Sequence, residues 1–206
     1  MTPRCFSAME VADTVQSMAS LAPDAGRITR DRYQQLVADG TIGTDDRVEL
    51  LDGLIVAMSP QNPAHAGVVG KLALRLGGIT GSAAFVRVQS PLDLSRMSMP
   101  EADIAVVPGH PDDYMAAHPT TALLIVEVAD SSVIQGRFTK APLYAAADIP
   151  EYWLVNLRDR CIEVYRRPIR EERRYAEARM AHVGETLDVV AFSRVAIGVA
   201  EILPPD

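Results

Sequence analysis

Two short apolar runs, each interrupted by one acidic side chain, constrain the fold of this chain more than any other feature. Residues 102–107 are apolar except for Asp103, and residues 122–128 are apolar except for Glu127. Both runs predict strands, and the second is typical of a central strand that a sheet buries on both faces. An ionised carboxylate in such a strand is costly unless it meets a partner or an opening to solvent. Glu127 therefore needs one or the other.

The rest of the chain alternates helical and extended patterns. Thr29 predicts the N-cap of a helix that ends near Gly40, and Asp52-Gly53 between two apolar runs predicts a hairpin with Glu49 on its first strand. A helix is also expected from Ser131, with Pro142 marking either its regular start or a kink. The remaining predictions are a helix over 64–76, a surface loop over 109–120, strands over 83–89, 152–155 and 161–166, a short continuation over 91–94, and short strands near 174–175, 186–190 and 195–199.

These elements predict one mixed α/β domain with a central β-sheet flanked by helices and with additional antiparallel strands. A chain of 206 residues is long enough for one domain with a sizeable core. We assign residues 28–206 to this domain and residues 1–27 to an N-terminal extension that need not be fully ordered.

Charge and cysteine content limit the possible functions. The net charge of −7 argues against a protein that coats nucleic acid or anionic membrane by bulk charge. Cys5 and Cys161 are too far apart to indicate a disulfide framework or a zinc site. No apolar run approaches the roughly 20 residues of a membrane helix, and the N-terminus lacks a signal-peptide pattern. We expect a cytoplasmic protein without a membrane partner.

The acids suggest metal-assisted chemistry. If their strands are neighbours, Asp103 and Glu127 could share Mg²⁺, which is usually held by one or two carboxylates plus water and phosphate oxygens. Lys140 could orient an attacking water or stabilise an anionic transition state, and Glu49 could add a third carboxylate. Such a set would hydrolyse phosphodiester bonds.

Each residue also has a structural interpretation, and the spacing does not decide between the two. Asp103 could terminate a strand, and Glu127 could pair with an arginine. Glu49 could be a solvated strand residue, and Lys140 an ordinary surface lysine.

Several segments, in this order, resemble the restriction-endonuclease-like superfamily with its PD-(D/E)xK signature, and more closely the Uma family of predicted endonucleases. The resemblance extends from Tyr33 to Leu203 and rests on residues 49–53, 59–60 with His65, 88–92, 103–107, 127–132, 140–145 and 149–155. It implies a restriction-endonuclease-like fold, Mg²⁺ or Mn²⁺ as cofactor and DNA as substrate. A homodimer is expected because two copies of a small nuclease commonly cut the two strands.

The resemblance also implies roles for individual residues. Asp103, Glu127 and the backbone carbonyl of Val128 would bind the metal, and Glu49 would be an auxiliary acid. The simple motif places its lysine at position 129, which is Ala129 here, so Lys140 is the expected replacement. His65 and Gln89 are secondary candidates, although a histidine at a helix start often caps or packs instead.

Three positions depart from the family pattern. Ala102 replaces the proline that usually precedes the motif aspartate, and Asp148 replaces a glycine that usually follows the helix. Gly136 replaces an aspartate four residues before the lysine, which removes an acid that could support the site.

Three hypotheses follow. The first is a metal-dependent DNA endonuclease, and the second is a non-catalytic nuclease-like module for dimerisation or interaction. The third is a structural protein whose acids pair with arginines.

The arginine-rich run 166–174 could contact a phosphate backbone. It could also form a solvated turn, since Glu171 and Glu172 dilute its positive charge.

Overall fold

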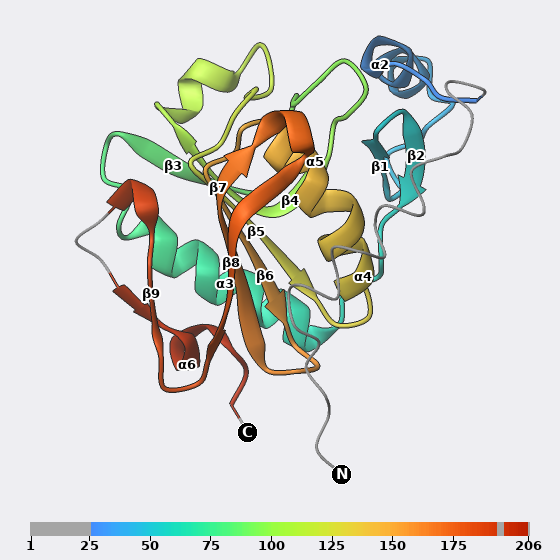
Figure 1. Cartoon of the computed structure of the whole chain (residues 1–206). Helices are drawn as coiled ribbons and strands as arrows, with labels where there is room; N and C mark the ends of the chain where they lie inside the picture. The colour runs from blue at the N-terminus through green and yellow to red at the C-terminus, as the bar shows by residue number, and fades with distance from the viewer. Residues whose placement is uncertain (1–25, 193–195, 206) are drawn as a thin grey trace.

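The computed structural model describes residues 26–192 and 196–205. Their main feature is a six-stranded sheet in the order β3-β4-β5-β6-β7-β8, in which only β5 and β6 run parallel (Figure 1). The predicted mixed sheet is therefore confirmed. Its strands are β3 (Ala84–Pro91), β4 (Glu101–Pro108), β5 (Leu124–Ala129), β6 (Glu151–Asn156), β7 (Cys161–Ile169) and β8 (Arg174–His182).

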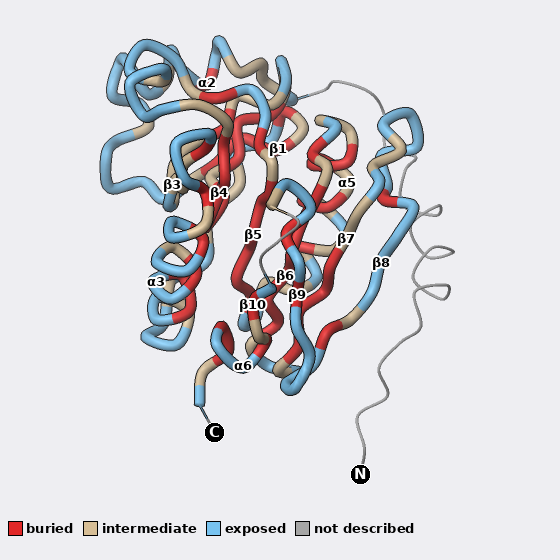
Figure 2. The backbone as a smooth tube through the Cα atoms, turned by 90° about the vertical axis from the view of Figure 1, so that its left-hand side faces the viewer, coloured by how far each residue is buried: buried red, intermediate tan, exposed pale blue. Residues whose placement is uncertain are grey.

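Helices cover both faces of the sheet. On one face α3 (Pro63–Gly77) places Val68 and Leu72 against alternate residues of β4 and β5, such as Ile104. On the other face α5 (Ala141–Ala146) packs against the intervening residues, such as Ala105. Since side chains alternate between the faces of a strand, β4 and β5 need apolar residues at nearly every position. Figure 2 shows β5 buried along its length.

A two-stranded hairpin stands beside the main sheet, formed by β1 (Val48–Leu51) and β2 (Leu54–Ala57). Its turn residues Asp52 and Gly53 have φ angles of 47° and 82°, as the predicted tight turn requires. A bridge between Leu50 and Met99 ties the hairpin to the segment that enters β4. The predicted helix is also confirmed as α2 (Arg30–Ala38), capped by the Thr29 side chain, which accepts a hydrogen bond from the backbone N–H of Arg32.

The helical segment after β5 is interrupted. It consists of α4 (Val133–Gln135), a π-helical turn (Gly136–Lys140) and α5. Pro142 lies in the first turn of α5, directly after the π-helical turn. The regular α-helix therefore starts near Pro142, which is the first of the two alternatives.

Two strand predictions were too short or misplaced. β3 continues to Pro91, although Gln89 has a φ of 45°, and of the expected continuation over 91–94 only Pro91 belongs to a strand. β8 has nine residues instead of the expected two. It is an edge strand in which Tyr175 and Ala181 are buried among largely exposed side chains, so its hydrophobic pattern is weak.

The C-terminal region adds a second small sheet, β9 (Thr186–Asp188) with β10 (Ala196–Gly198), and the short helix α6 (Val199–Ile202). Asp148, at the position where the resembled family has glycine, has a φ of 59°, which glycine adopts more readily. Nearly all of the expected N-terminal extension, and Cys5 with it, lies outside the described residues. No helix within residues 26–192 and 196–205 is long and apolar enough to cross a membrane.

Candidate active site

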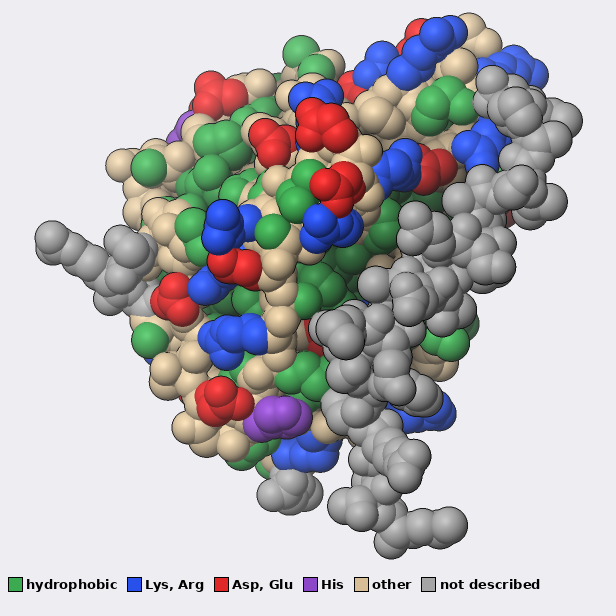
Figure 3. Space-filling view, viewed as in Figure 1, with side chains coloured by type: hydrophobic (Ala, Val, Ile, Leu, Met, Phe, Trp, Pro, Cys, Tyr) green, Lys and Arg blue, Asp and Glu red, His purple; other side chains and the backbone are tan. Residues whose placement is uncertain are grey.

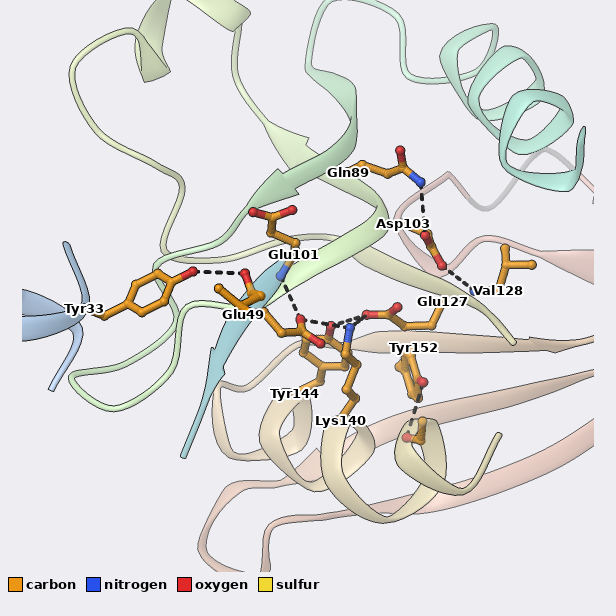
Figure 4. Close-up of polar contacts among 12 residues, drawn as sticks. Tyr33, Glu49, Gln89, Glu101, Asp103, Glu127, Val128, Lys140, Tyr144 and Tyr152 are labelled. Carbon is orange, nitrogen blue, oxygen red and sulfur yellow. Dashed lines mark hydrogen bonds and ion pairs between the residues drawn. The ribbon is translucent and has the colours of Figure 1, made fainter. Parts of the chain in front are cut away.

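The structure brings the four principal candidate residues to one pocket, a cavity of about 50 Å³ (Figure 4). Glu49 comes from β1, Asp103 from β4, Glu127 from β5 and Lys140 from the end of the π-helical turn. Hydrogen-bonded pairing of β4 with β5 reaches only to Ile104 and Val126. The two central acids therefore lie where the strands separate, and this separation opens the pocket.

Lys140 lies between two carboxylates. Its Nζ is 2.9 Å from Glu127 Oε1 and 3.1 Å from Glu49 Oε2. Lys140 is only 6% exposed and Glu49 only 2% exposed, so the surface-lysine and solvated-strand interpretations are wrong. Burial favours loss of the lysine proton, but the two carboxylates outweigh it and raise the pKa of Lys140. The lysine is therefore held as a buried cation.

Glu127 accepts two hydrogen bonds at Oε1, from Lys140 Nζ and, at 2.5 Å, from the hydroxyl of Tyr144. Burial raises the pKa of Glu127 to about 7; Lys140 opposes this effect, and Asp103 and Glu49 add to it. Burial and Glu127 also raise the pKa of Tyr144, which keeps its hydroxyl protonated as a donor. The partner of Glu127 is thus a lysine and a tyrosine, and the arginine interpretation is wrong.

Asp103 is held by three donors. Its Oδ2 accepts hydrogen bonds from the backbone N–H of Val128 at 2.8 Å and from His65 Nε2 at 3.1 Å, and its Oδ1 accepts one from Gln89 Nε2 at 3.4 Å. Burial alone would raise the pKa of Asp103, but the bonds from His65 and Val128 lower it below its ordinary value. Asp103 is therefore an ionised carboxylate in a fixed orientation.

Both secondary candidates, His65 and Gln89, hydrogen-bond to Asp103. His65 lies near the start of α3, where the cap is the Asn62 side chain and not the histidine. The hydrogen bond to Asp103 raises the pKa of His65, against the effect of burial. Val128, whose backbone carbonyl is a candidate metal ligand, follows Glu127 on β5 and lines the same pocket.

Two residues of the site were missed from the sequence. Glu101 lines the pocket, and its backbone N–H donates to Glu49 Oε2 at 3.0 Å. It precedes Asp103 by two residues, a spacing that places both acids on one side of a strand. Tyr144 follows Lys140 by four residues, the spacing of neighbours on a helix. Both signals were present in the sequence, but neither indicates what the side chain would contact.

Neighbouring side chains leave no space at Gly136 for the aspartate that the family usually has there. A Cβ atom on Gly136 would lie 2.7 Å from Leu154 Cδ1 and 3.2 Å from the hydroxyl of Tyr152. That hydroxyl donates to the backbone carbonyl of Gly136 at 3.3 Å. Leu154 thus fills the space that an aspartate side chain at this position would need.

The donor set fits Mg²⁺ or Mn²⁺ better than zinc. Within residues 26–192 and 196–205, no three His, Cys, Asp or Glu side chains are arranged to hold an ion together. Mg²⁺ needs only one or two protein carboxylates, because water and substrate phosphate complete its shell. Asp103 and Glu127 supply such oxygens, and a cation would relieve the cost of ionising the buried Glu127.

The arginine-rich run near the β7–β8 turn is neutralised by acids. Arg166 pairs with Glu151, and Arg167 with Glu177. Basic and acidic side chains alternate over this face in Figure 3. Further pairs join Arg173 to Asp52 and Arg174 to Glu172. The run therefore forms no continuous basic surface for a phosphate backbone.

The sheet order, the helices on both faces and the acids at the parting of β4 and β5 define an α/β protein of nuclease-like fold. The same fold occurs in a crystal structure described as "a putative nuclease belonging to DUF820 from Anabaena variabilis ATCC 29413", with a TM-score of 0.67. The two chains are 13% identical over 85% of this chain and 97% of the other, so the likeness shows the fold alone.

The sequence gives the family. Residues 30–200 match the model of the Uma2 family, which is described as "Putative restriction endonuclease". The chain belongs to this family. No curated protein matches it in sequence.

Proposed function

We propose that this protein is a Mg²⁺- or Mn²⁺-dependent endonuclease that hydrolyses phosphodiester bonds in DNA. The observation that carries the proposal is the convergence of Glu49, Asp103, Glu127 and Lys140, from four separate elements, on one pocket. Membership of a family of restriction-endonuclease-like proteins supports nuclease chemistry at this pocket.

Each residue has a task in this proposal. Asp103, Glu127 and the Val128 carbonyl bind the metal. A bound Mg²⁺ supplies Lewis acidity at a phosphoryl oxygen and makes a bound water more acidic. Lys140 places a positive charge beside the reacting phosphate, where negative charge develops. Glu49 holds Lys140 at 3.1 Å. Tyr144 holds Glu127 by a hydrogen bond. His65 and Gln89 hold Asp103 in the same way.

Cleavage of plasmid DNA by the purified protein tests the proposal. The wild type should nick or linearise plasmid with Mg²⁺ or Mn²⁺ and not with EDTA. Asp103→Asn should lower the rate by more than about 100-fold, because it weakens a metal ligand. Asp112→Asn, which removes an exposed acid outside the pocket, should cut like the wild type. Absence of cleavage, or equal cleavage by Asp103→Asn, contradicts the proposal.

A non-catalytic nuclease-like module is the second candidate function. The observation that favours it is Gly136, where Leu154 occupies the place of the usual acid. Calorimetry separates the two candidates. Binding of Mn²⁺ that Glu127→Ala abolishes supports the enzyme, and a wild type that binds no divalent metal supports the module.

We further infer that two copies act together in the cytoplasm, because a cut through both DNA strands is commonly made by two copies of a small nuclease. Light scattering of the purified protein should give twice the mass of one 22.3 kDa chain. A single-chain mass at assay concentration contradicts this inference.

A further inference from the structure

Arg47 lies at the mouth of the pocket and is exposed. It precedes β1 and stands two residues before Glu49, so both side chains lie on the pocket side of the hairpin. Its backbone carbonyl accepts a hydrogen bond from Met58 N at 2.8 Å, which anchors this position at the open end of the hairpin. Its guanidinium makes no hydrogen bond or ion pair within residues 26–192 and 196–205.

The charge balance of the pocket makes this arginine important. Four carboxylates line the pocket, from Glu49, Glu101, Asp103 and Glu127. Lys140 is buried and already bonded to two of them. Arg47 is the other arginine or lysine among the described lining residues. It lies near enough to Glu101 to oppose the rise in pKa that burial causes in that acid, and without a short ion pair its N–H donors remain available to an incoming anion. Asp46, the neighbouring acid, is turned away to accept a hydrogen bond from Gly43 N at 2.8 Å.

The size of the pocket decides how a DNA strand can approach. A water molecule needs about 10–15 Å³ of such space, so a cavity of about 50 Å³ holds a few waters or a hydrated ion. The buried acids are reached from this small space, so a strand that lies across the mouth brings a phosphate to them, and at the mouth it meets Arg47.

We propose that Arg47 binds the phosphate next to the scissile one, through two parallel N–H bonds from its guanidinium. A guanidinium matches the geometry of phosphate oxygens better than an ammonium does. The contact offsets the repulsion between the DNA backbone and the acidic pocket. This inference rests on the proposed function and adds to it a substrate-binding residue outside the set of acids and lysine.

Anisotropy of a short labelled DNA duplex in EDTA, measured over a range of salt concentrations, tests the contact. Arg47→Ala should weaken binding about tenfold at low salt and reduce the slope of log K against log salt by about one. Arg47→Lys should restore the slope but only part of the affinity. Arg179→Ala is the matched control, because it removes an exposed charge from the far edge strand β8. Equal affinities and slopes for Arg47→Ala and Arg179→Ala overturn the inference.

Cleavage with Mg²⁺ distinguishes failure of this inference from failure of the proposed function. Arg47→Ala should raise KM about tenfold and leave kcat near the wild-type value at saturating DNA. Wild-type cleavage with an unaffected Arg47→Ala overturns the phosphate contact alone. Wild-type binding that depends on Arg47, without any cleavage, overturns the endonuclease proposal and keeps the contact. A wild type that neither binds DNA at low salt nor cleaves it with Mg²⁺ overturns both.

Discussion

The π-helical turn carries two basic residues, and each meets a buried glutamate in a different way. Arg137 bonds both oxygens of Glu163 on β7, with Nε 2.9 Å from each oxygen and Nη2 2.6 Å from Oε1. Lys140, three residues later, divides its charge between Glu127 and Glu49. Glu163 and Glu127 are similarly buried, at 4% and 7% exposed, and each also accepts a tyrosine hydroxyl.

The difference between the two pairs lies in what remains unbalanced. The guanidinium of Arg137 bonds both oxygens of one carboxylate, so the positive and negative charges of the Arg137–Glu163 pair balance each other. We call such a balanced pair closed. Lys140 carries one positive charge among four pocket-lining carboxylates, so an excess of negative charge remains beside the cavity even with Arg47 at its mouth. A buried ion pair by itself therefore does not mark a functional site in this protein, whereas an excess of carboxylates over cations next to a cavity does.

The closed pair should give the largest effect on stability. Arg137→Met leaves Glu163 buried without its cation and should lower the free energy of unfolding by about 3–5 kcal/mol. Urea denaturation measures the change, and the double variant with Glu163→Leu should recover much of the loss. A loss below 1 kcal/mol would show that the pair is not closed as described.

Lys140→Met should give the largest effect on activity. It removes the positive charge beside the reacting phosphate and should lower kcat by at least about 100-fold. Arg137→Met, assayed on folded protein at low temperature, should retain most of the wild-type kcat. Equal losses in the two variants would remove the functional distinction between the two pairs.

The excess of carboxylates in the pocket should make the free energy of unfolding depend on pH. The pKa of Glu127 is raised to about 7 by burial, from an ordinary value of 4.5. An acid with a raised pKa is favoured in its neutral form, so the free energy of unfolding falls as pH rises from 4.5 through 7. In EDTA, Glu127→Gln should therefore be more stable than the wild type by about 1–2 kcal/mol near pH 8, with little difference near pH 5.

Denaturation curves at the two pH values measure the difference. Glu163→Gln is the matched control, since it removes the partner of Arg137 and should destabilise the protein at both pH values. A Glu127→Gln variant that is less stable than the wild type at pH 8 would contradict the idea of excess negative charge.

The smallest expected effect concerns His65. Its hydrogen bond to Asp103 raises the pKa of the imidazole, with burial opposing. The stability that this bond contributes is therefore complete below the ordinary value of 6.5 and is lost as pH rises through the raised pKa. His65→Gln should cost less than about 1 kcal/mol near pH 6 and even less near pH 9, whereas His182→Gln, at an exposed histidine of β8, should leave the curve unchanged. An effect of His65→Gln that grows with pH would show that the bond does not control the stability.

Much of the fold follows from signals within a few residues. Thr29 caps its helix, Asp52-Gly53 turns the hairpin, and the apolar runs around Asp103 and Glu127 form neighbouring strands. Edge strand β8 was underestimated, because a strand with solvent on much of its surface carries little hydrophobic pattern. Local sequence thus predicted the elements best where their conformation depends on turn chemistry or on burial of both faces.

The sequence by itself determined which acids stand in apolar strands, and the physical reason is the cost of burying an unpaired charge. Only the tertiary structure decided what balances them. The residues involved are far apart along the chain, as Glu101 N–H and Glu49 show, whose positions differ by 52. Arg137 meets one carboxylate and balances its charge, whereas Lys140 meets more carboxylates than it can balance. The difference depends on how many carboxylates the folded chain brings near each basic side chain. That number is set by packing, and no local pattern contains it.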